Sequence, residues 1–74
     1  MSVRVFKGAN EITSSNLVGD TVLDAFLELS SVLNISDDDK ARVNGTVIEK
    51  EAFDDHIIRD GDQVEFYKAQ GEKG

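Results

Sequence analysis

Only one stretch of this sequence has the apolar period of an α-helix, and segments with the period of β-strands lie on both sides of it. Apolar residues recur there at steps of four, three and four, at Val22, Phe26, Leu29 and Leu33. This spacing places them on one face of a helix. Three further apolar residues widen that face: Leu23, Ala25 and Val32. A single helix with one apolar face must cover something, and the strand-like segments indicate a sheet.

Local signals bound this helix at both ends. Asp20 or Thr21 can accept hydrogen bonds from the free N–H groups of the first turn, and Thr21 with Asp24 resembles a capping box. After the helix, Asn34 suits a left-handed conformation. We expect Ile35 to turn back under the sheet.

Period-two alternation and turn residues predict the strands. The predicted strands span residues 2–7, 11–15, 41–43, 46–48 and 63–68. Asn44-Gly45 is the strongest dipeptide signal for a hairpin turn, and Gly61 lies in a second tight turn. The order ββαβββ predicts an α+β domain with a mixed sheet. We expect the first and last strands to run parallel at its centre, with the helix on one face.

Two connections complete the chain. Residues 49–56 are polar apart from Ala52 and Phe53, so we expect a connecting turn in which Phe53 anchors the core. Residues 36–40 are predicted to form an exposed loop. The acidic run Asp37-Asp38-Asp39 falls in this loop and is expected to be solvated.

The composition excludes several classes of site. The 74 residues contain no cysteine and one histidine, which excludes disulfides, thiolate zinc sites and cysteine nucleophiles. The carboxylates are scattered, and the serines lack a base partner at nucleophile spacing. We therefore expect no enzyme, no metal and no cofactor. His56 beside Asp54 and Asp55 is interpreted as a solvent-facing histidine in a turn, and Asp60 and Asp62 as turn residues.

Net charge and hydropathy narrow the class of partner. Fifteen acidic residues against eight basic ones give a formal charge of -7, which argues against a nucleic-acid backbone as partner. The same charge speeds encounter with basic protein surfaces. No apolar stretch approaches the ~20 residues that span a bilayer. The N-terminal residues have the pattern of a strand, unlike a signal peptide, so a cytoplasmic, membrane-free monomer is expected.

Three motifs in order resemble the sulfur-carrier (ThiS/MoaD-like) branch of the ubiquitin-like β-grasp proteins. Residues 19–27 are similar to the Thr-Val-x-x-Leu helix start of that family. Residues 41–48 resemble its V-N-G-x-x-V hairpin, and residues 58–66 its L-x-D-G-D-x-V-x-F element. Together with the first strand, these motifs cover nearly the whole chain. The resemblance implies a β-grasp domain over residues 1–68 and a flexible C-terminal tail over 69–74.

In the carriers, the chemistry resides in a C-terminal Gly-Gly. The resemblance implies a partner enzyme of the adenylating, E1/ThiF-like kind, which activates the terminal carboxylate before sulfur replaces the AMP. Glycines allow such a tail to pass through a narrow channel. This sequence departs from the pattern, because it ends Gly71-Glu72-Lys73-Gly74 with a single terminal glycine.

Three functional hypotheses follow. The first is a non-catalytic, ubiquitin-like protein-interaction module, with partner-binding candidates at Arg42, Tyr67, Lys68, Gly71 and Gly74. The alternative is a sulfur carrier or ubiquitin-like modifier that is activated at Gly74. A third interpretation is an acidic inhibitor or nucleic-acid mimic, which rests on charge and size alone.

Overall fold

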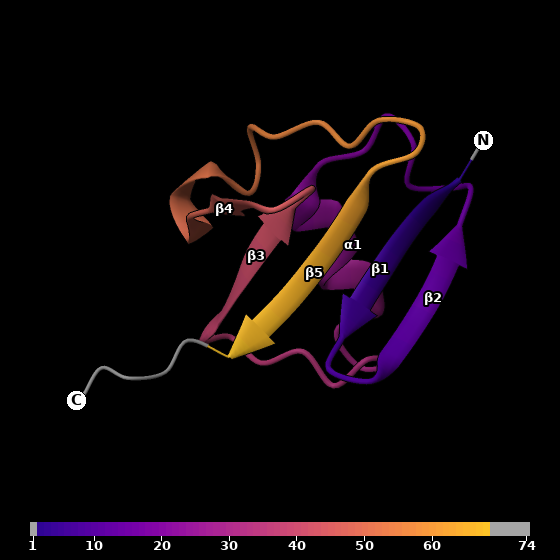
Figure 1. Cartoon of the computed structure of the whole chain (residues 1–74). Coiled ribbons are helices and arrows are strands. Elements are labelled where there is room, and N and C mark those ends of the chain that lie inside the picture. The colour runs from indigo at the N-terminus through magenta and orange to yellow at the C-terminus, as the bar shows by residue number, and fades with distance from the viewer. Residues whose placement is uncertain (1, 69–74) are drawn as a thin grey trace.

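The computed structural model describes residues 2–68 of the chain as a five-stranded sheet with one α-helix (Figure 1). The strands are β1 (Val3–Lys7), β2 (Asn10–Ser14), β3 (Asp39–Val43), β4 (Thr46–Ile48) and β5 (Gln63–Lys68). The helix is α1 (Val22–Leu29), and a 3-10 turn, η1, covers Lys50–Ala52. The predicted order ββαβββ is therefore confirmed.

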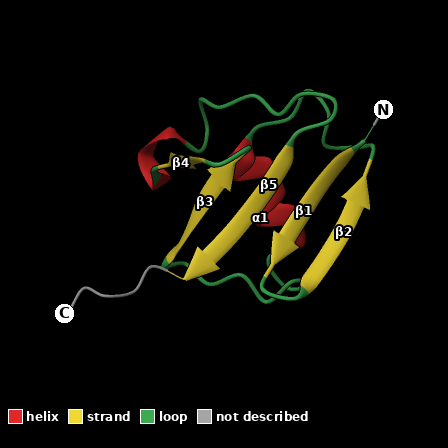
Figure 2. Ribbon diagram, viewed as in Figure 1, coloured by secondary structure: helices red, strands yellow, loops and turns green. Residues whose placement is uncertain are grey.

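The sheet is mixed, with strand order β2-β1-β5-β3-β4. The first and last strands are parallel neighbours at its centre, with Val5 opposite Val64, and all other neighbouring pairs are antiparallel. Figure 2 shows α1 crossing one face of the sheet, while the opposite face carries no helix. The predicted β-grasp arrangement, with one helix on one face, is confirmed. Within residues 2–68, no helix has the length and hydropathy needed to cross a membrane.

Helix α1 begins with the predicted capping box. The Thr21 hydroxyl accepts a hydrogen bond from the Asp24 N–H at 3.1 Å, and the Asp24 carboxylate accepts one from the Thr21 N–H at 3.1 Å. The helical turns end at Leu29, which is earlier than the apolar stripe suggests. Asn34 has the expected positive φ of 59°, but it closes a run of turns after the helix. As a result, Val32 is 64% exposed, and the prediction that it widens the apolar face is wrong.

Three phenylalanine rings form the centre of the core. Phe26 of α1, Phe53 of the connection and Phe66 of β5 have ring centroids 6.2 to 6.3 Å apart in tilted or edge-on pairs. Such geometry lets the positive ring edge meet the negative ring face. Phe53 is 1% exposed, which confirms its predicted role as a core anchor. The cluster therefore joins the helix, the sheet and the long β4–β5 connection.

The loop predicted over residues 36–40 is partly wrong. β3 already begins at Asp39, and Asp39 is 2% exposed. Its carboxylate accepts hydrogen bonds from the Ser36 N–H at 3.2 Å and the Ser36 hydroxyl at 3.0 Å, and it forms an ion pair with the Lys7 ammonium. Charge-run statistics could not reveal this partner, because Lys7 is 32 residues away in sequence. Asp37 and Asp38 are exposed as predicted.

Burial and hydrogen bonding act on Asp39 in opposite directions. Burial raises the pKa of its carboxyl, whereas the hydrogen bonds from Lys7 and Ser36 lower it, and the pKa lies below the usual value as the net result. A carboxyl with a depressed folded-state pKa stabilises the fold above its unfolded pKa of about 3.9. That contribution disappears as the pH falls through the folded-state pKa.

The first prediction concerns the hairpin turn, where Asn44 and Gly45 have φ values of 52° and 89°. Gly45→Ala is expected to lower the free energy of unfolding by about 1 kcal/mol, because an alanine in this region is strained. No atom lies within 4 Å of the added Cβ, so steric clash makes no contribution. Urea denaturation against the exposed neighbour Thr46→Ala measures the difference. Equal midpoints for the two variants would contradict the assigned turn.

The second prediction concerns acid stability. Asp39→Asn is expected to lower the free energy of unfolding by about 3 kcal/mol at neutral pH, because it leaves Lys7 without its buried partner. The loss should begin to shrink as the pH falls below about 4 and should disappear as the pH falls through the lower folded-state pKa of Asp39, where the wild-type carboxylate also becomes protonated. Thermal unfolding from pH 7 to pH 2 checks this, with the exposed Asp38→Asn as control. A difference that stayed constant over this range would show that the charge of Asp39 is not responsible.

Candidate functional site

The face of the sheet opposite α1 is the candidate site, and strand alternation determines which side chains lie on it. Val3 and Val5 of β1, and Val64 and Phe66 of β5, are buried beneath the helix. Their neighbours along each strand point the other way. The exposed face therefore carries residues from all five strands: Arg4, Phe6, Glu11, Thr13, Lys40, Arg42, Val47, Gln63, Glu65 and Tyr67.

Two arginines on this face make matching sets of contacts. The Arg4 guanidinium lies 5.6 Å from the centroid of the Phe6 ring and 2.8 Å from the Glu11 carboxylate. The Arg42 guanidinium lies 4.5 Å from the centroid of the Tyr67 ring and 3.5 Å from the Glu65 carboxylate. Each arginine thus contacts one aromatic ring and one glutamate. We call the six residues Arg4, Phe6, Glu11, Arg42, Glu65 and Tyr67 the arginine face.

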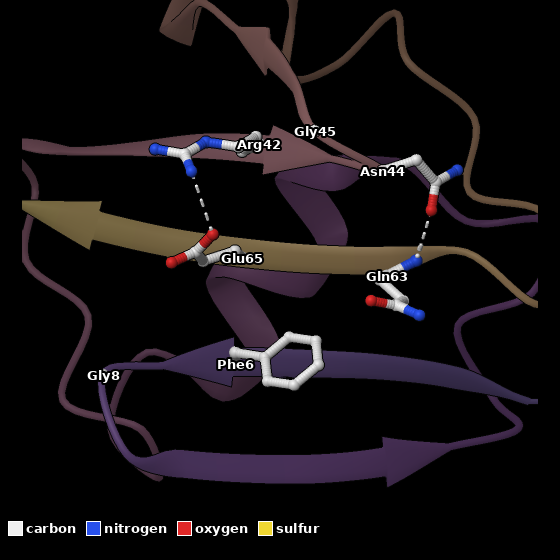
Figure 3. Close-up of a pocket in the computed structure, with 7 residues that line it drawn as sticks. All are labelled: Phe6, Gly8, Arg42, Asn44, Gly45, Gln63 and Glu65. Atoms are coloured by element: carbon white, nitrogen blue, oxygen red, sulfur yellow. Dashed lines mark hydrogen bonds and ion pairs between the residues drawn. The ribbon is translucent and has the colours of Figure 1, made fainter.

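A shallow recess of about 340 Å³ opens between β1, β5 and the β3–β4 turn (Figure 3). Its lining residues are Phe6, Gly8, Arg42, Asn44, Gly45, Gln63 and Glu65. The Asn44 side chain fixes one wall, because its Oδ1 accepts from the Gln63 N–H at 2.9 Å and its amide donates to Asp62 at 2.9 Å. The recess is therefore bounded by an aromatic ring, an ion pair and a rigid turn.

This arrangement suits contact with a protein surface. The exposed ion pairs add little stability, since pairs of this kind are worth about 0–1 kcal/mol. Arginine and aromatic side chains that their neighbours already hold in place lose little freedom on binding, and they are enriched among residues that dominate binding energy. Among residues 2–68, no group of three or more histidine or acidic side chains could hold a metal ion.

The structure brings together two of the predicted partner-binding residues. Arg42 and Tyr67, which are far apart in sequence, are in cation–π contact on the arginine face. Lys68 is exposed at the last position of β5, opposite Asp39 of β3, and alternation turns its side chain away from that face. Gly71 and Gly74 lie outside the described residues.

Sequence reasoning did not single out Arg4, Phe6, Glu11 or Glu65 as candidates. A signal was present, because Arg4 and Phe6 alternate with the buried Val3 and Val5. Their contacts required the strand register, which places Phe6 opposite both Glu11 and Glu65. His56 was predicted to face solvent, whereas the structure shows it half-buried. It lines a separate hollow together with Asp55 and Asp62.

Comparison with known proteins connects this fold to one family. No protein-family model matches the chain, and a search of curated proteins found no relative. Among solved structures, the thiamine biosynthesis protein ThiS from Geobacter metallireducens matches with 30% sequence identity and a TM-score of 0.61. The match covers 92% of this chain and 96% of that protein. Since the likeness extends over nearly all of both chains, this protein belongs to the ThiS-like sulfur-carrier family of β-grasp proteins.

Proposed function

We propose that this protein is a sulfur carrier of the ThiS kind, activated at the carboxylate of Gly74. The observation that carries the proposal is the likeness to ThiS, at 30% identity over 92% of the chain. Likeness in fold alone would leave function open, because one fold serves many functions. Here the match also covers 96% of the ThiS chain, so the likeness extends over nearly the whole of that chain and is not confined to one motif.

The proposed reaction places the catalytic groups on a partner. A Gly74 carboxylate oxygen attacks the α-phosphate of ATP and releases pyrophosphate, which forms an acyl adenylate. Sulfide (HS⁻) from a sulfur donor then attacks the acyl carbon, AMP leaves with the electron pair of the broken C–O bond, and loss of the S–H proton to solvent gives the thiocarboxylate. In this proposal the domain supplies recognition through its open sheet face, and an adenylating, ThiF-like enzyme supplies the catalysis.

We propose that the arginine face is the surface that binds this enzyme. Tyr67 lies on β5, the strand that leads to the C-terminus, and Arg42 lies on its neighbour β3. Lys68, Gly71 and Gly74 would follow into the partner's active site. The formal charge of -7 favours encounter with a partner whose approach surface is basic.

One observation favours a second candidate function. Glu72 and Lys73 stand where the carriers have small residues, and long side chains hinder passage through a narrow channel. A non-catalytic interaction module would use the arginine face in the same way and leave Gly74 unmodified. The two functions therefore differ at the C-terminus and agree on the binding surface.

The third prediction tests the activation of Gly74. Incubation with ATP, a sulfur donor and a ThiF-like adenylating enzyme should produce the adenylate and then the thiocarboxylate at Gly74. Intact-mass spectrometry detects both products, and fragmentation assigns the modified residue. A variant without Gly74 ends in Lys73. It should react at least about tenfold more slowly than the wild type, because the lysine side chain crowds the terminal carboxylate.

The same experiment separates the two functions. Glu72→Gly with Lys73→Gly should match or exceed the wild-type rate if the chain is a carrier. Binding of the enzyme without any modification of the wild-type chain would reject the carrier and support the interaction module. A chain that neither binds nor reacts would reject both functions with that partner.

The fourth prediction tests the arginine face. Arg42→Ala and Tyr67→Ala are each expected to weaken enzyme binding by about tenfold, because each removes one member of a preorganised pair. Isothermal titration calorimetry measures the dissociation constant. Glu28→Ala on the opposite side of the domain is the matched control and should bind like the wild type. Wild-type affinity in both Arg42→Ala and Tyr67→Ala would exclude this face as the binding surface.

A further inference from the structure

The Lys7–Asp39 ion pair connects two strands that are not neighbours. β1 and β3 lie on opposite sides of β5, so their backbones are about 9–10 Å apart, twice the spacing between adjacent strands. Lys7 ends β1 and Asp39 begins β3, and both lie at the end of the sheet where β5 finishes (Figure 1). Their side chains meet in an ion pair, so the contact crosses β5.

The register shows where along β5 the crossing occurs. Lys7 is opposite Phe66, and Asp39 is opposite Lys68. Asp39 lies two and four residues before the buried Ala41 and Val43, so its carboxylate is on the same side of the sheet as these residues, the helix side. The pair therefore passes beneath the last three residues of β5, and we call it the strap.

The strap is held in one geometry. The Asp39 side chain is fully buried, and the Lys7 side chain is 21% exposed. The Ser36 N–H donates at 3.2 Å to Oδ2, the oxygen that also pairs with Lys7, and the Ser36 hydroxyl donates at 3.0 Å to Oδ1, so both carboxylate oxygens are held. Buried ion pairs of this kind give little net stability compared with apolar residues of the same volume, whereas they do impose geometry. Its position at the end of β5 thus needs an explanation beyond stability.

We propose that Lys7 and Asp39 are positioning residues, which hold the end of β5 so that the reactive segment starts from a fixed point. This inference rests on the proposed function. Gly74 lies six positions after Lys68. If β5 frayed back to Phe66, the free segment would run over the eight positions that follow Phe66, up to Gly74. Length alone would then lower the effective concentration of the carboxylate by about 1.5-fold. Loss of a fixed starting direction would lower it further, because orientation contributes strongly to rate.

The test compares an uncharged pair with a stability control. The double variant Lys7→Met with Asp39→Asn, which we call the uncharged pair, leaves no buried charge unpaired, so the domain is expected to fold. Val3→Ala lies at the other end of β1 and removes buried apolar contacts. All assays are run at one temperature at which thermal unfolding shows that both variants are folded. Steady-state adenylation by the ThiF-like enzyme gives kcat and KM, and amide hydrogen exchange reports on Phe66, Tyr67 and Lys68.

If the strap positions the chain end, the uncharged pair lowers kcat by about fivefold and changes KM by less than about twofold. Amide exchange at Tyr67 and Lys68 accelerates, whereas exchange in β2 does not. The single variant Lys7→Arg keeps the wild-type kcat and the wild-type amide exchange, because it keeps a cation within reach of Asp39. Val3→Ala leaves kcat unchanged.

Equal kcat values for the uncharged pair and Val3→Ala would overturn the positioning role, and so would unchanged exchange at the end of β5. Failure of the proposed function would look different, because the wild-type chain itself would give no adenylate. The positioning role would then fall with that function, and the exchange experiment would still decide whether the strap holds β5.

Discussion

The parallel pairing of β1 with β5 is the constraint on which the rest of this structure depends. Parallel neighbours cannot be joined by a tight turn, so the chain between them must cross over the sheet. In this protein the crossing segment contains α1, whose apolar face covers Val5 and Val64 at the sheet centre. The same pairing leaves the opposite face open and brings the last strand to the middle of the domain. Core, arginine face and strap all follow from it.

Central placement of β5 also connects the open face of the sheet with the end of the described chain. β5 has a neighbour on each side, so it contributes Glu65 and Tyr67 to the open face and is crossed beneath by the Lys7–Asp39 pair. A strand that is bonded on both sides frays less readily than an edge strand. A carrier needs both a surface that binds its enzyme and a chain end that starts from a defined position. In this fold one strand can serve both needs.

Sequence patterns predicted the local structure well and the long-range contacts poorly. The capping box of Thr21 and Asp24, the Asn44-Gly45 turn and the Phe53 anchor each depend on residues a few positions apart, or on hydrophobicity alone. Val32 was misplaced because the apolar period continues for a turn beyond the point where the helix ends. The prediction that Asp39 is solvated is wrong because the sequence does not show that Lys7, 32 positions away, pairs with its carboxylate.

By itself, the sequence determined the order of elements and the helix face that is buried, because these depend on period and turn residues. Its motifs also indicate the carrier family to which the likeness to ThiS assigns the chain. Tertiary structure alone decided which side chains meet. Phe6 lies between Glu11 and Glu65, Arg42 stacks on Tyr67, and Lys7 reaches Asp39 across β5. The physical reason is strand register, which joins residues far apart in the chain and is set by the packing of the whole sheet.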